Sequence, residues 1–202
     1  MHTYENDLHS KGYRAIAGVD EVGRGCLFGD VVAAAVILPE GLVIEGVNDS
    51  KKLSEKQREE LYPIIMEKAL SVGIGRVDAQ TVDNINIRQA ARLAMKIAVE
   101  SLDVKPDYLL VDAETVSVAV PQTAVIHGDA LSQSIAAASI IAKVTRDRLC
   151  NEWDRLYPEY GLGKHKGYAT KYHREQLLIY GASPMHRKSF LGKLFAEQIE
   201  LF

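Results

Sequence analysis

The 202-residue sequence predicts an α/β fold, in which a mixed sheet packs with helices and a C-terminal helical cap. Short apolar runs of strand length alternate with segments whose apolar residues recur at helical spacing. Hydrophobic residues make up 47% and charged residues 25% of the chain, a balance that can fill a globular core. We therefore expect a main domain over residues 1–155 and a C-terminal helical extension over residues 156–202, both within one compact unit.

Three strands are expected in the first part of the chain. Residues 13–20 and 31–38 are short runs rich in β-branched residues and alanine, and a glycine-rich connection separates them. We interpret these two runs as paired strands. Residues 72–77, with the sequence VGIGRV, predict a third strand.

Two helices are expected in the same part. Ser54 opens the first, because a serine followed three residues later by Gln57 forms a capping box ahead of apolar residues at helical spacing. Pro63 falls inside this pattern and is expected to kink the helix or to divide it in two. Residues 87–102 repeat small and apolar residues with a period of about 3.6 and predict the second helix.

The second half of the chain adds strands and helices around a glycine-rich loop. Residues 108–112, with the sequence YLLVD, form an apolar run that ends in an acid. The other elements are expected as a short strand at 124–127, an alanine-rich helix at 132–149, weaker helices at 171–179 and 193–199, and a loop at 161–167.

Composition narrows the compartment and the class of protein. No apolar stretch approaches the roughly 20 residues that cross a bilayer, and residues 1–10 lack the apolar centre of a secretory signal. Cys26 and Cys150 form neither a disulfide framework nor a CxxC metal motif, so a cytoplasmic enzyme is the simplest interpretation. The net charge of −3 argues against a protein that coats DNA. It is compatible with an enzyme that holds metals in carboxylates and grips phosphates with local basic patches.

The first candidate site is the run Asp20-Glu21-Val22-Gly23-Arg24-Gly25 at the end of a predicted strand. An acidic pair before a turn is usually a surface feature. Side chains alternate between faces along a strand, so adjacent acids serve one site only where the chain bends, and we expect the glycines to supply that bend. Glycine also lets backbone N–H groups approach a ligand closely, and Arg24 adds a fork that suits phosphate.

Two further acids occupy element ends. Asp112 closes an apolar strand, where a turn or capping residue is common but where open α/β sheets also place functional groups. Asp129 precedes the alanine-rich helix, and an aspartate there is often a cap. Four carboxylates without a cysteine cluster or spaced histidines are the ligand set of Mg²⁺ or Mn²⁺. Two such ions can support in-line hydrolysis of a phosphodiester.

Six blocks of the sequence together resemble the bacterial ribonuclease HII family, in the order and spacing of that family and over about residues 13–190. The blocks are GVDEVGRG at 18–25, NDSKKL at 48–53, VDAET at 111–115, GDALSQSIAAASIIAKVTRD at 128–147, GLGKHKGYAT at 161–170 and SPMHRKSF at 183–190.

The resemblance implies a ribonuclease H-like fold, with a central mixed five-stranded sheet flanked by helices and a C-terminal helical extension. It implies cleavage of the RNA strand in RNA–DNA hybrids and incision 5′ to a single ribonucleotide in duplex DNA. The expected products are a 3′-hydroxyl and a 5′-phosphate, formed by two-metal-ion hydrolysis. By position, Asp20, Glu21, Asp112 and Asp129 are the expected catalytic and metal-binding carboxylates, with Mg²⁺ or Mn²⁺ as cofactor.

The resemblance also assigns residues to the substrate. Gly23, Arg24 and Gly25 are expected to read the 2′-hydroxyl at the RNA–DNA junction. Tyr168 is expected to stack under the sugar of the first deoxyribonucleotide, where an isolated sequence would suggest only a partly buried loop tyrosine. Because the 2′-hydroxyl alone distinguishes a ribonucleotide from its neighbours, the residues that read it must come very close.

Basic residues near these blocks are expected to hold backbone phosphates, although an isolated charge run is usually a solvated face. The residues that we assign to phosphate or substrate binding are Ser50, Lys51, Lys164, Lys166 and Arg187. His165, His186 and Lys188 accompany them in the same loops.

The chain departs from the family pattern beside the site. Residues 26–30, Cys-Leu-Phe-Gly-Asp, replace a stretch in which proline is common. We expect Cys26 to serve in packing and Asp30 to add negative charge near the substrate. His127 stands where a lysine often precedes the Gly-Asp pair, and VDAET replaces a common Asp-Gly. The effect of these departures on substrate preference stays open.

Several alternatives compete with this interpretation. Ribonuclease HIII usually carries an additional N-terminal domain and lacks the GRG form. A general hybrid nuclease has no need of GRG with Tyr168, and a non-catalytic hybrid-binding module would be expected to lose a carboxylate. A small-molecule phosphatase does not explain the basic loops. The resemblance suggests a monomer, and nothing in the sequence assigns a contact with a sliding clamp.

Overall fold

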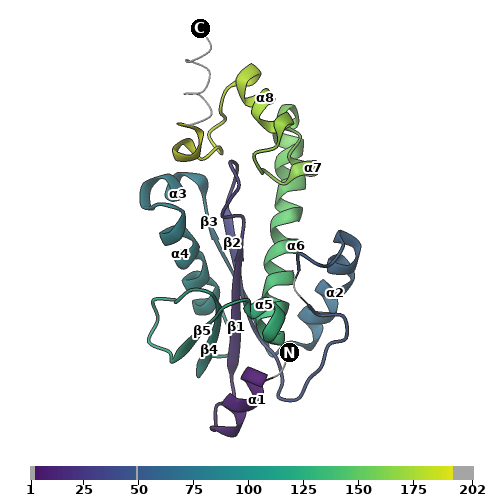
Figure 1. Ribbon diagram of the computed structural model, residues 1–202, viewed down its shortest axis with the longest axis vertical. Helices are drawn as coiled ribbons and strands as arrows, with labels where there is room; N and C mark the ends of the chain where they lie inside the picture. The colour runs from purple at the N-terminus through teal and green to yellow at the C-terminus, as the bar shows by residue number, and fades with distance from the viewer. Residues whose placement is uncertain (1–2, 49, 193–202) are drawn as a thin grey trace.

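A mixed five-stranded sheet forms the centre of the molecule in the computed structural model, which describes residues 3–48 and 50–192 (Figure 1). The strand order is β3-β2-β1-β4-β5. β1 pairs antiparallel with β2 and parallel with β4, which confirms the predicted mixed sheet. The strands are β1 (Ile16–Val22), β2 (Val31–Ile37), β3 (Ser71–Val77), β4 (Tyr108–Asp112) and β5 (Gln122–Val125).

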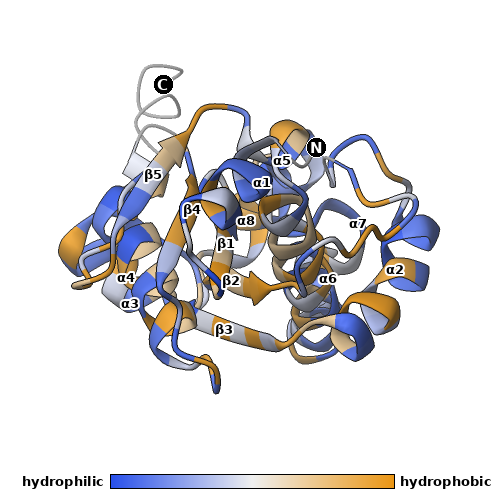
Figure 2. Ribbon diagram, turned by 90° about the horizontal axis from the view of Figure 1, so that it is seen from below, coloured by the Kyte–Doolittle hydropathy of each residue, from blue (hydrophilic) through white to orange (hydrophobic). Residues whose placement is uncertain are grey.

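Helices cover both faces of the sheet, as Figure 2 shows in the view from below. On one face lies α4 (Ile87–Glu100), which packs with α3 (Ala79–Ile85). On the other face lies α6 (Gln133–Leu156), with α2 (Glu55–Lys68) packed against it. All seven residues of β2 are buried, because a strand covered on both faces has no solvent side.

α6 approaches β1 unusually closely. A Cβ atom at Gly18 would overlap the backbone of Ser134, so only glycine permits this approach. The apolar face of α6 here consists mainly of alanine, which keeps the helix axis close to the strand. The consequence for function is that side chains on the first half of α6 reach the residues of β1.

The predicted elements are present with shifted ends. The capping box of Ser54 with Gln57 is confirmed, and α2 continues through Pro63 without dividing. β1 begins and ends later than predicted, and α6 continues to Leu156 because its apolar positions run on to Trp153. The predicted loop at 161–167 is wrong in part, since it contains the short helix α7 (Leu162–His165). The helix expected at 193–199 lies outside the described residues.

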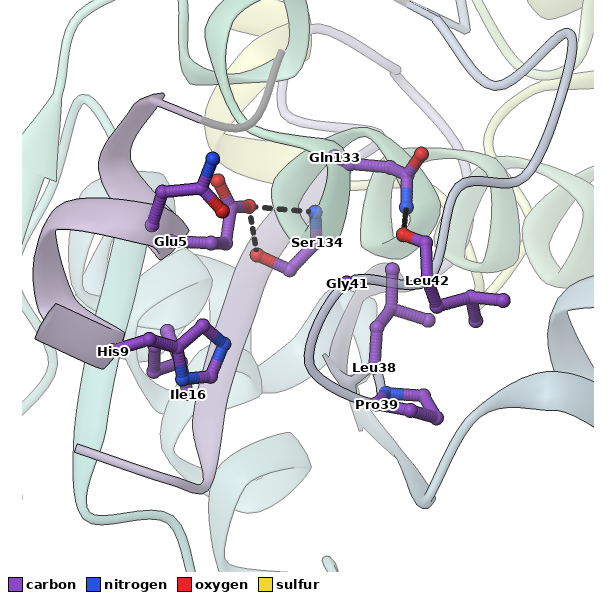
Figure 3. Close-up of a pocket in the computed structure, with 10 residues that line it drawn as sticks. Glu5, His9, Ile16, Leu38, Pro39, Gly41, Leu42, Gln133 and Ser134 are labelled. Carbon is purple, nitrogen blue, oxygen red and sulfur yellow. Dashed lines mark hydrogen bonds between the residues drawn. The ribbon is translucent and has the colours of Figure 1, made fainter. Parts of the chain in front are cut away.

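The short helices α1 (Thr3–Ser10), α3 and α5 (Gly128–Leu131) were not predicted. α1 holds the start of α6 through the carboxylate of Glu5, which accepts hydrogen bonds from Ser132 Oγ at 2.6 Å and Ser134 Oγ at 2.7 Å. Figure 3 shows Glu5 turned toward Ser134. A carboxylate is favourable there because it faces the positive end of the helix.

The C-terminal part lies beyond one end of the sheet, opposite α1 (Figure 1). It contains the 3₁₀ turn Pro158–Tyr160, α7 and α8 (Lys171–Tyr180). Its core surrounds Phe28, a residue of the segment that follows β1. The extension is therefore packed directly on the loop next to the acidic pair. No helix in the described residues is long and apolar enough to cross a membrane.

Candidate active site

Asp20 and Asp112 lie next to each other on two neighbouring parallel strands. Val19 of β1 pairs with Val111 of β4, and each acid is the next residue of its strand. Gly18 faces α6, so the alternation along β1 directs Asp20 to the same face. The side chain of Asp112 accepts a hydrogen bond from the backbone N–H of Gly128 at 2.8 Å. Two carboxylates thus share one corner of the sheet beneath α6.

Burial and neighbouring negative charges both act on Asp20 in this corner. Burial raises the pKa of Asp20 well above its ordinary value of 3.8, and the negative charges of Glu21 and Asp112 raise it further. A hydrogen bond from Ser139 of α6 and one from the backbone N–H of Glu21, at 2.7 Å, oppose this rise. Negative charge is therefore concentrated here beyond what the neighbouring donors compensate.

Glu21 takes a different direction from Asp20. β1 stays paired with β2 through Glu21 and Val22, so the bend follows the acidic pair and does not fall between its members. Burial raises the pKa of Glu21, while Arg24, at 3.1 Å from its carboxylate, lowers it. The glycines therefore do not supply a bend between the two acids. Glu21 still lies near the corner, because its charge raises the pKa of Asp20 and the charge of Asp112 raises the pKa of Glu21.

Asp129 lies in α5, immediately after the strand β5. Its carboxylate is 3.5 Å from the ammonium group of Lys51, and its side chain is buried. The N-cap position of α5 belongs to His127, so Asp129 does not cap this helix. The hydrogen bond from the Gly128 backbone N–H to the Asp112 carboxylate places the next residue, Asp129, near the corner of the sheet.

The donor set suits a hard cation, although the side chains are not gathered around one point. Among residues 3–48 and 50–192, no three Asp, Glu, His or Cys side chains form a ready metal site. Glu21 instead faces Arg24, and Asp129 faces Lys51. The buried carboxylate of Asp20 beside that of Asp112 is the feature that fits Mg²⁺ or Mn²⁺, because burial and then the charges of Glu21 and Asp112 disfavour its ionised form and a bound cation would favour it.

The loop after β1 approaches Tyr168. Gly23 has a φ angle of +91°, and a Cβ atom there would overlap the guanidinium of Arg146, so glycine is required twice over. A Cβ at Gly25 would lie 3.7 Å from Cε1 of Tyr168. Tyr168 is 43% exposed as a whole residue and lies beside the loop. Two blocks that are far apart in sequence thus form one surface.

Arg187 supports this loop from the protein interior. Its side chain is fully buried, and its guanidinium donates to the carbonyl oxygens of Gly23 at 2.7 Å, Arg24 at 3.1 Å and Gly29 at 2.9 Å. Burial lowers the pKa of Arg187 to about 10. The expected phosphate contact is therefore wrong for this residue, because its donors are directed at backbone oxygens inside the protein.

Arg146 supports the same loop from α6, a role that was not predicted from the sequence. Its guanidinium donates to the carbonyl oxygens of Phe28 at 3.0 Å, Asp30 at 3.0 Å and Lys166 at 2.8 Å. It is fully buried. The signal was an arginine on the same helix face as Ala142 and Cys150, four residues away on either side, where the pattern predicts an apolar residue.

The predicted phosphate-binding residues differ in exposure. Lys164 and Lys51 are exposed, whereas the Lys166 ammonium contacts Asn151 at 3.0 Å and Glu55 at 3.8 Å. Ser50 is buried, and its hydroxyl forms a 2.8 Å hydrogen bond with Ser139. The Ser50 side chain therefore faces α6, which corrects the expected outward contact.

The unusual segment 26–30 is mostly internal. Cys26 is buried, as expected for packing, and its thiol lies 3.5 Å from the carbonyl oxygen of Lys166. Asp30 is buried and pairs with Arg76 at 2.8 Å. The expected extra negative charge near the substrate is wrong, because Arg76 compensates it. His127 is exposed and has a left-handed backbone, with φ of +56°.

Comparison with known proteins gives consistent similarity. The family model for ribonuclease HII matches residues 17–193. Ribonuclease HII of Alkaliphilus metalliredigens is 61% identical over 196 residues, which cover 94% of this chain and 96% of that protein. The matched regions include both the acidic corner of the sheet and the C-terminal sequence blocks.

Solved structures agree with this similarity. The ribonuclease H2 of Pyrococcus horikoshii superposes with a TM-score of 0.75 at 27% identity and covers 90% of this chain and 97% of its own. The ribonuclease HII of Archaeoglobus fulgidus, solved in complex with PCNA, gives a TM-score of 0.72 at 28% identity over 86% of this chain and 94% of its own. The ribonuclease H-like fold expected from the sequence is thereby confirmed.

Proposed function

Since the chain belongs to the ribonuclease HII family, we propose that it incises duplex DNA 5′ to a single embedded ribonucleotide. The family assignment makes it a divalent-metal-dependent ribonuclease H, which acts on RNA–DNA hybrids. The proposal adds that hydrolysis uses two metal ions and leaves a 3′-hydroxyl and a 5′-phosphate. It also places the protein in ribonucleotide excision repair, as a cytoplasmic monomer.

We assign Asp20, Glu21, Asp112 and Asp129 as the residues that would hold Mg²⁺ or Mn²⁺. The support is the concentration of negative charge at Asp20, which buried donors leave uncompensated. A divalent ion there would supply a more acidic water and would neutralise charge on the leaving oxygen. Glu21 pairs with Arg24, and Asp129 pairs with Lys51. In the proposed metal-bound state, these two carboxylates exchange their basic partners for the metal ion.

The observation that carries single-ribonucleotide incision is the approach of Tyr168 to Gly25, 3.7 Å from the Cβ position of that glycine. Backbone without a side chain can come close enough to distinguish a 2′-hydroxyl. An aromatic ring packs well on a sugar that lacks this hydroxyl. We therefore assign Gly23, Arg24 and Gly25 to the ribonucleotide and Tyr168 to the deoxyribonucleotide that follows it.

We assign phosphate contacts to Lys51, whose ammonium lies 3.5 Å from the Asp129 carboxylate, and to Lys164, which is exposed on α7. Lys166, whose ammonium contacts Asn151 and Glu55, receives a weaker role. Such contacts orient the duplex without reading its sequence. The net charge of −3 is compatible with this arrangement, because the positive charge needed is local.

The decisive experiment gives the purified protein a duplex that contains one ribonucleotide, with Mg²⁺, with Mn²⁺ and with chelator. The expected result is a metal-dependent nick on the 5′ side of the ribonucleotide. A parallel substrate with a continuous RNA tract tests hybrid cleavage. Cleavage of the tract without the single-ribonucleotide nick would overturn the proposal in favour of a general hybrid nuclease.

A further inference from the structure

Three histidines of the C-terminal extension lie together in the protein interior beside Tyr168. The His165 and His173 rings stack with centroids 4.5 Å apart, and the His186 ring lies 5.3 Å from that of His173. His173 and His186 are fully or almost fully buried. Neither reaches the surface where a substrate binds, so direct contact with nucleic acid does not explain them.

The hydrogen bonds around these rings fix where each proton sits. The backbone N–H of Ser183 donates to Nδ1 of His186 at 3.0 Å, and a backbone N–H can only donate, so Nδ1 of His186 is an acceptor. A neutral His186 then carries its proton on Nε2, which lies 3.1 Å from Nε2 of His173. His173 must accept there, and its own proton is on Nδ1.

The chain of hydrogen bonds ends at Tyr168. Nδ1 of His173 lies 2.9 Å from the carbonyl oxygen of Tyr168 and donates to it. The same carbonyl accepts a hydrogen bond from the backbone N–H of Thr170 at 2.8 Å. A carbonyl oxygen has two lone pairs, and these two donors occupy both. The peptide that bears the Tyr168 ring is thus held from two directions.

The environment keeps both rings neutral, as the chain of donors requires. Burial lowers the pKa of His173 to about 4 and that of His186 to about 3. The edge of the Phe28 ring contacts His186 at a centroid distance of 4.7 Å, and the Tyr160 ring lies equally close. Apolar packing against aromatic rings disfavours a charged imidazole.

We propose that His173 and His186 are positioning residues, which hold Tyr168 beside Gly25 through this directed chain of hydrogen bonds. The inference rests on the proposed function, in which Tyr168 senses the RNA–DNA junction. The turn at residues 183–186 and the site loop are already joined, because the backbone N–H of Arg187 donates to the carbonyl of Leu27 at 2.8 Å. The histidine pair extends that connection to the tyrosine.

Amide substitutions test the direction of the chain. Asparagine places its amide near the position of Nδ1, whereas glutamine places it near Nε2. His173→Asn retains the donor to Tyr168, and His173→Gln loses it. At position 186 the preference is reversed, because His186→Gln retains the donor to His173 and His186→Asn loses it. At position 173 each variant gives up one hydrogen bond. At position 186, His186→Asn gives up the single bond to His173, whereas His186→Gln gives up the two bonds that Nδ1 accepts from the Ser183 backbone N–H and hydroxyl, so a larger effect of His186→Asn on Tyr168 cannot come from the number of bonds lost.

Two readouts are compared. The first is the ratio of kcat/KM on a single-ribonucleotide duplex to that on a continuous RNA–DNA hybrid, which we expect to fall roughly three- to tenfold in His173→Gln and His186→Asn only. The second is hydrogen exchange of the backbone amides in residues 166–170, which we expect to accelerate in the same two variants. Equal effects within each pair, on both readouts, would overturn the positioning role.

Nitrogen-15 NMR of the unmodified protein gives a test that does not depend on folding of variants. The neutral tautomers should be protonated at Nδ1 in His173 and at Nε2 in His186, and the opposite assignment at His173 would overturn the proposal. Amide exchange and tautomers need no substrate. If the parent protein failed to nick the single-ribonucleotide duplex, the proposed function would fail while these measurements still decided the positioning of Tyr168.

Discussion

The guanidinium of Arg187 donates a 2.7 Å hydrogen bond to the carbonyl oxygen of Gly23, although 164 positions separate the two residues. The contact joins the last motif of the sequence to the loop that follows the acidic pair. Arg146 binds the same loop from α6 through the carbonyls of Phe28 and Asp30. Two buried cations therefore fix the backbone of the loop at and beside its glycines, which have no side chains to anchor them by packing.

Replacement of Arg187 tests this support. Arg187→Met removes donors from three carbonyl oxygens, and loss of a buried, hydrogen-bonded charge should lower the free energy of unfolding by roughly 3 kcal/mol. We expect single-ribonucleotide cleavage to fall more than hybrid cleavage. Arg155→Met, at an exposed position of α6, is the control and should change neither property. Urea unfolding and the two cleavage assays measure the effect, and equal loss on both substrates would contradict a role confined to the loop.

The two glycines of the loop should respond differently to alanine. Gly23→Ala places a Cβ at φ of +91° and against Arg146, so we expect lower stability, by about 1–3 kcal/mol, and loss of both cleavage activities. Gly25→Ala meets only Tyr168, at an ordinary contact distance of 3.7 Å. This variant should fold normally and lose single-ribonucleotide cleavage selectively. Thermal unfolding together with the two substrates decides this, and a Gly25→Ala enzyme with unchanged selectivity would argue against close reading at that position.

Asp112→Asn separates chemistry from binding. Asparagine retains an oxygen that can accept from the Gly128 N–H, so the corner should keep its shape. It removes a charge that we assign to metal binding, and we expect turnover to fall by at least about a thousandfold. Affinity for the hybrid, measured by fluorescence anisotropy in Ca²⁺ or chelator, should stay within roughly threefold of the parent value. A matching loss of binding would mean that Asp112 is structural.

Much of the fold was predictable because local patterns agree with long-range packing. The five strands and the helices α2, α4, α6 and α8 follow from apolar periodicity and from the capping box at Ser54. The helices α1, α3 and α5 were missed, since they are short and depend on tertiary contacts. α1, for example, is held by Glu5 against Ser134, a contact that no local pattern predicts.

The site was predictable to a lesser extent. Motif spacing identified the acids and Tyr168, and the structure brings Asp20 next to Asp112 and Gly25 next to Tyr168. Spacing does not reveal where a basic side chain points. Arg187 was therefore assigned to phosphate although its donors are internal, because a sequence does not distinguish a solvated arginine from one that binds buried carbonyls.

The buried histidine pair makes stability depend on pH. His173 and His186 have folded-state pKa values of about 4 and about 3, below the ordinary value of 6.5. The unfolded chain binds these protons first, so the stabilisation is complete above pH 6.5 and is lost as pH falls toward those values. His186→Phe should reduce the slope of unfolding free energy against pH between 6 and 4 by up to about 1.4 kcal/mol per pH unit. Urea unfolding across that range measures it, and an unchanged slope would show that His186 is not neutral in the folded state.

The raised pKa of Asp20 leads to a prediction with the opposite sign. A carboxyl whose pKa rises on folding binds its proton more tightly in the folded state, so its contribution to stability falls as pH increases above 3.8. Without metal, ionised Asp20 therefore destabilises the protein at pH 7, chiefly through burial and then through Glu21 and Asp112. Asp20→Asn removes that charge, and in chelator we expect its melting temperature to rise by about 2–4 °C.

Added Mg²⁺ should reverse the order of the melting temperatures of the parent protein and Asp20→Asn. Mg²⁺ stabilises whichever form binds it, so the parent should gain thermal stability with added Mg²⁺ while Asp20→Asn gains little. Asp103→Asn is the control: Asp103 is exposed in the connection before β4, its backbone N–H donates to Ser71 Oγ at the start of β3, and the variant should follow the parent in both conditions. Calorimetry of the parent, Asp20→Asn and Asp103→Asn, each with chelator and with Mg²⁺, measures the six melting temperatures. An Asp20→Asn variant that melts below the parent in chelator would show that the carboxylate is compensated by donors other than Ser139 and the Glu21 backbone, and the case for a cation at this corner would then lose its electrostatic basis.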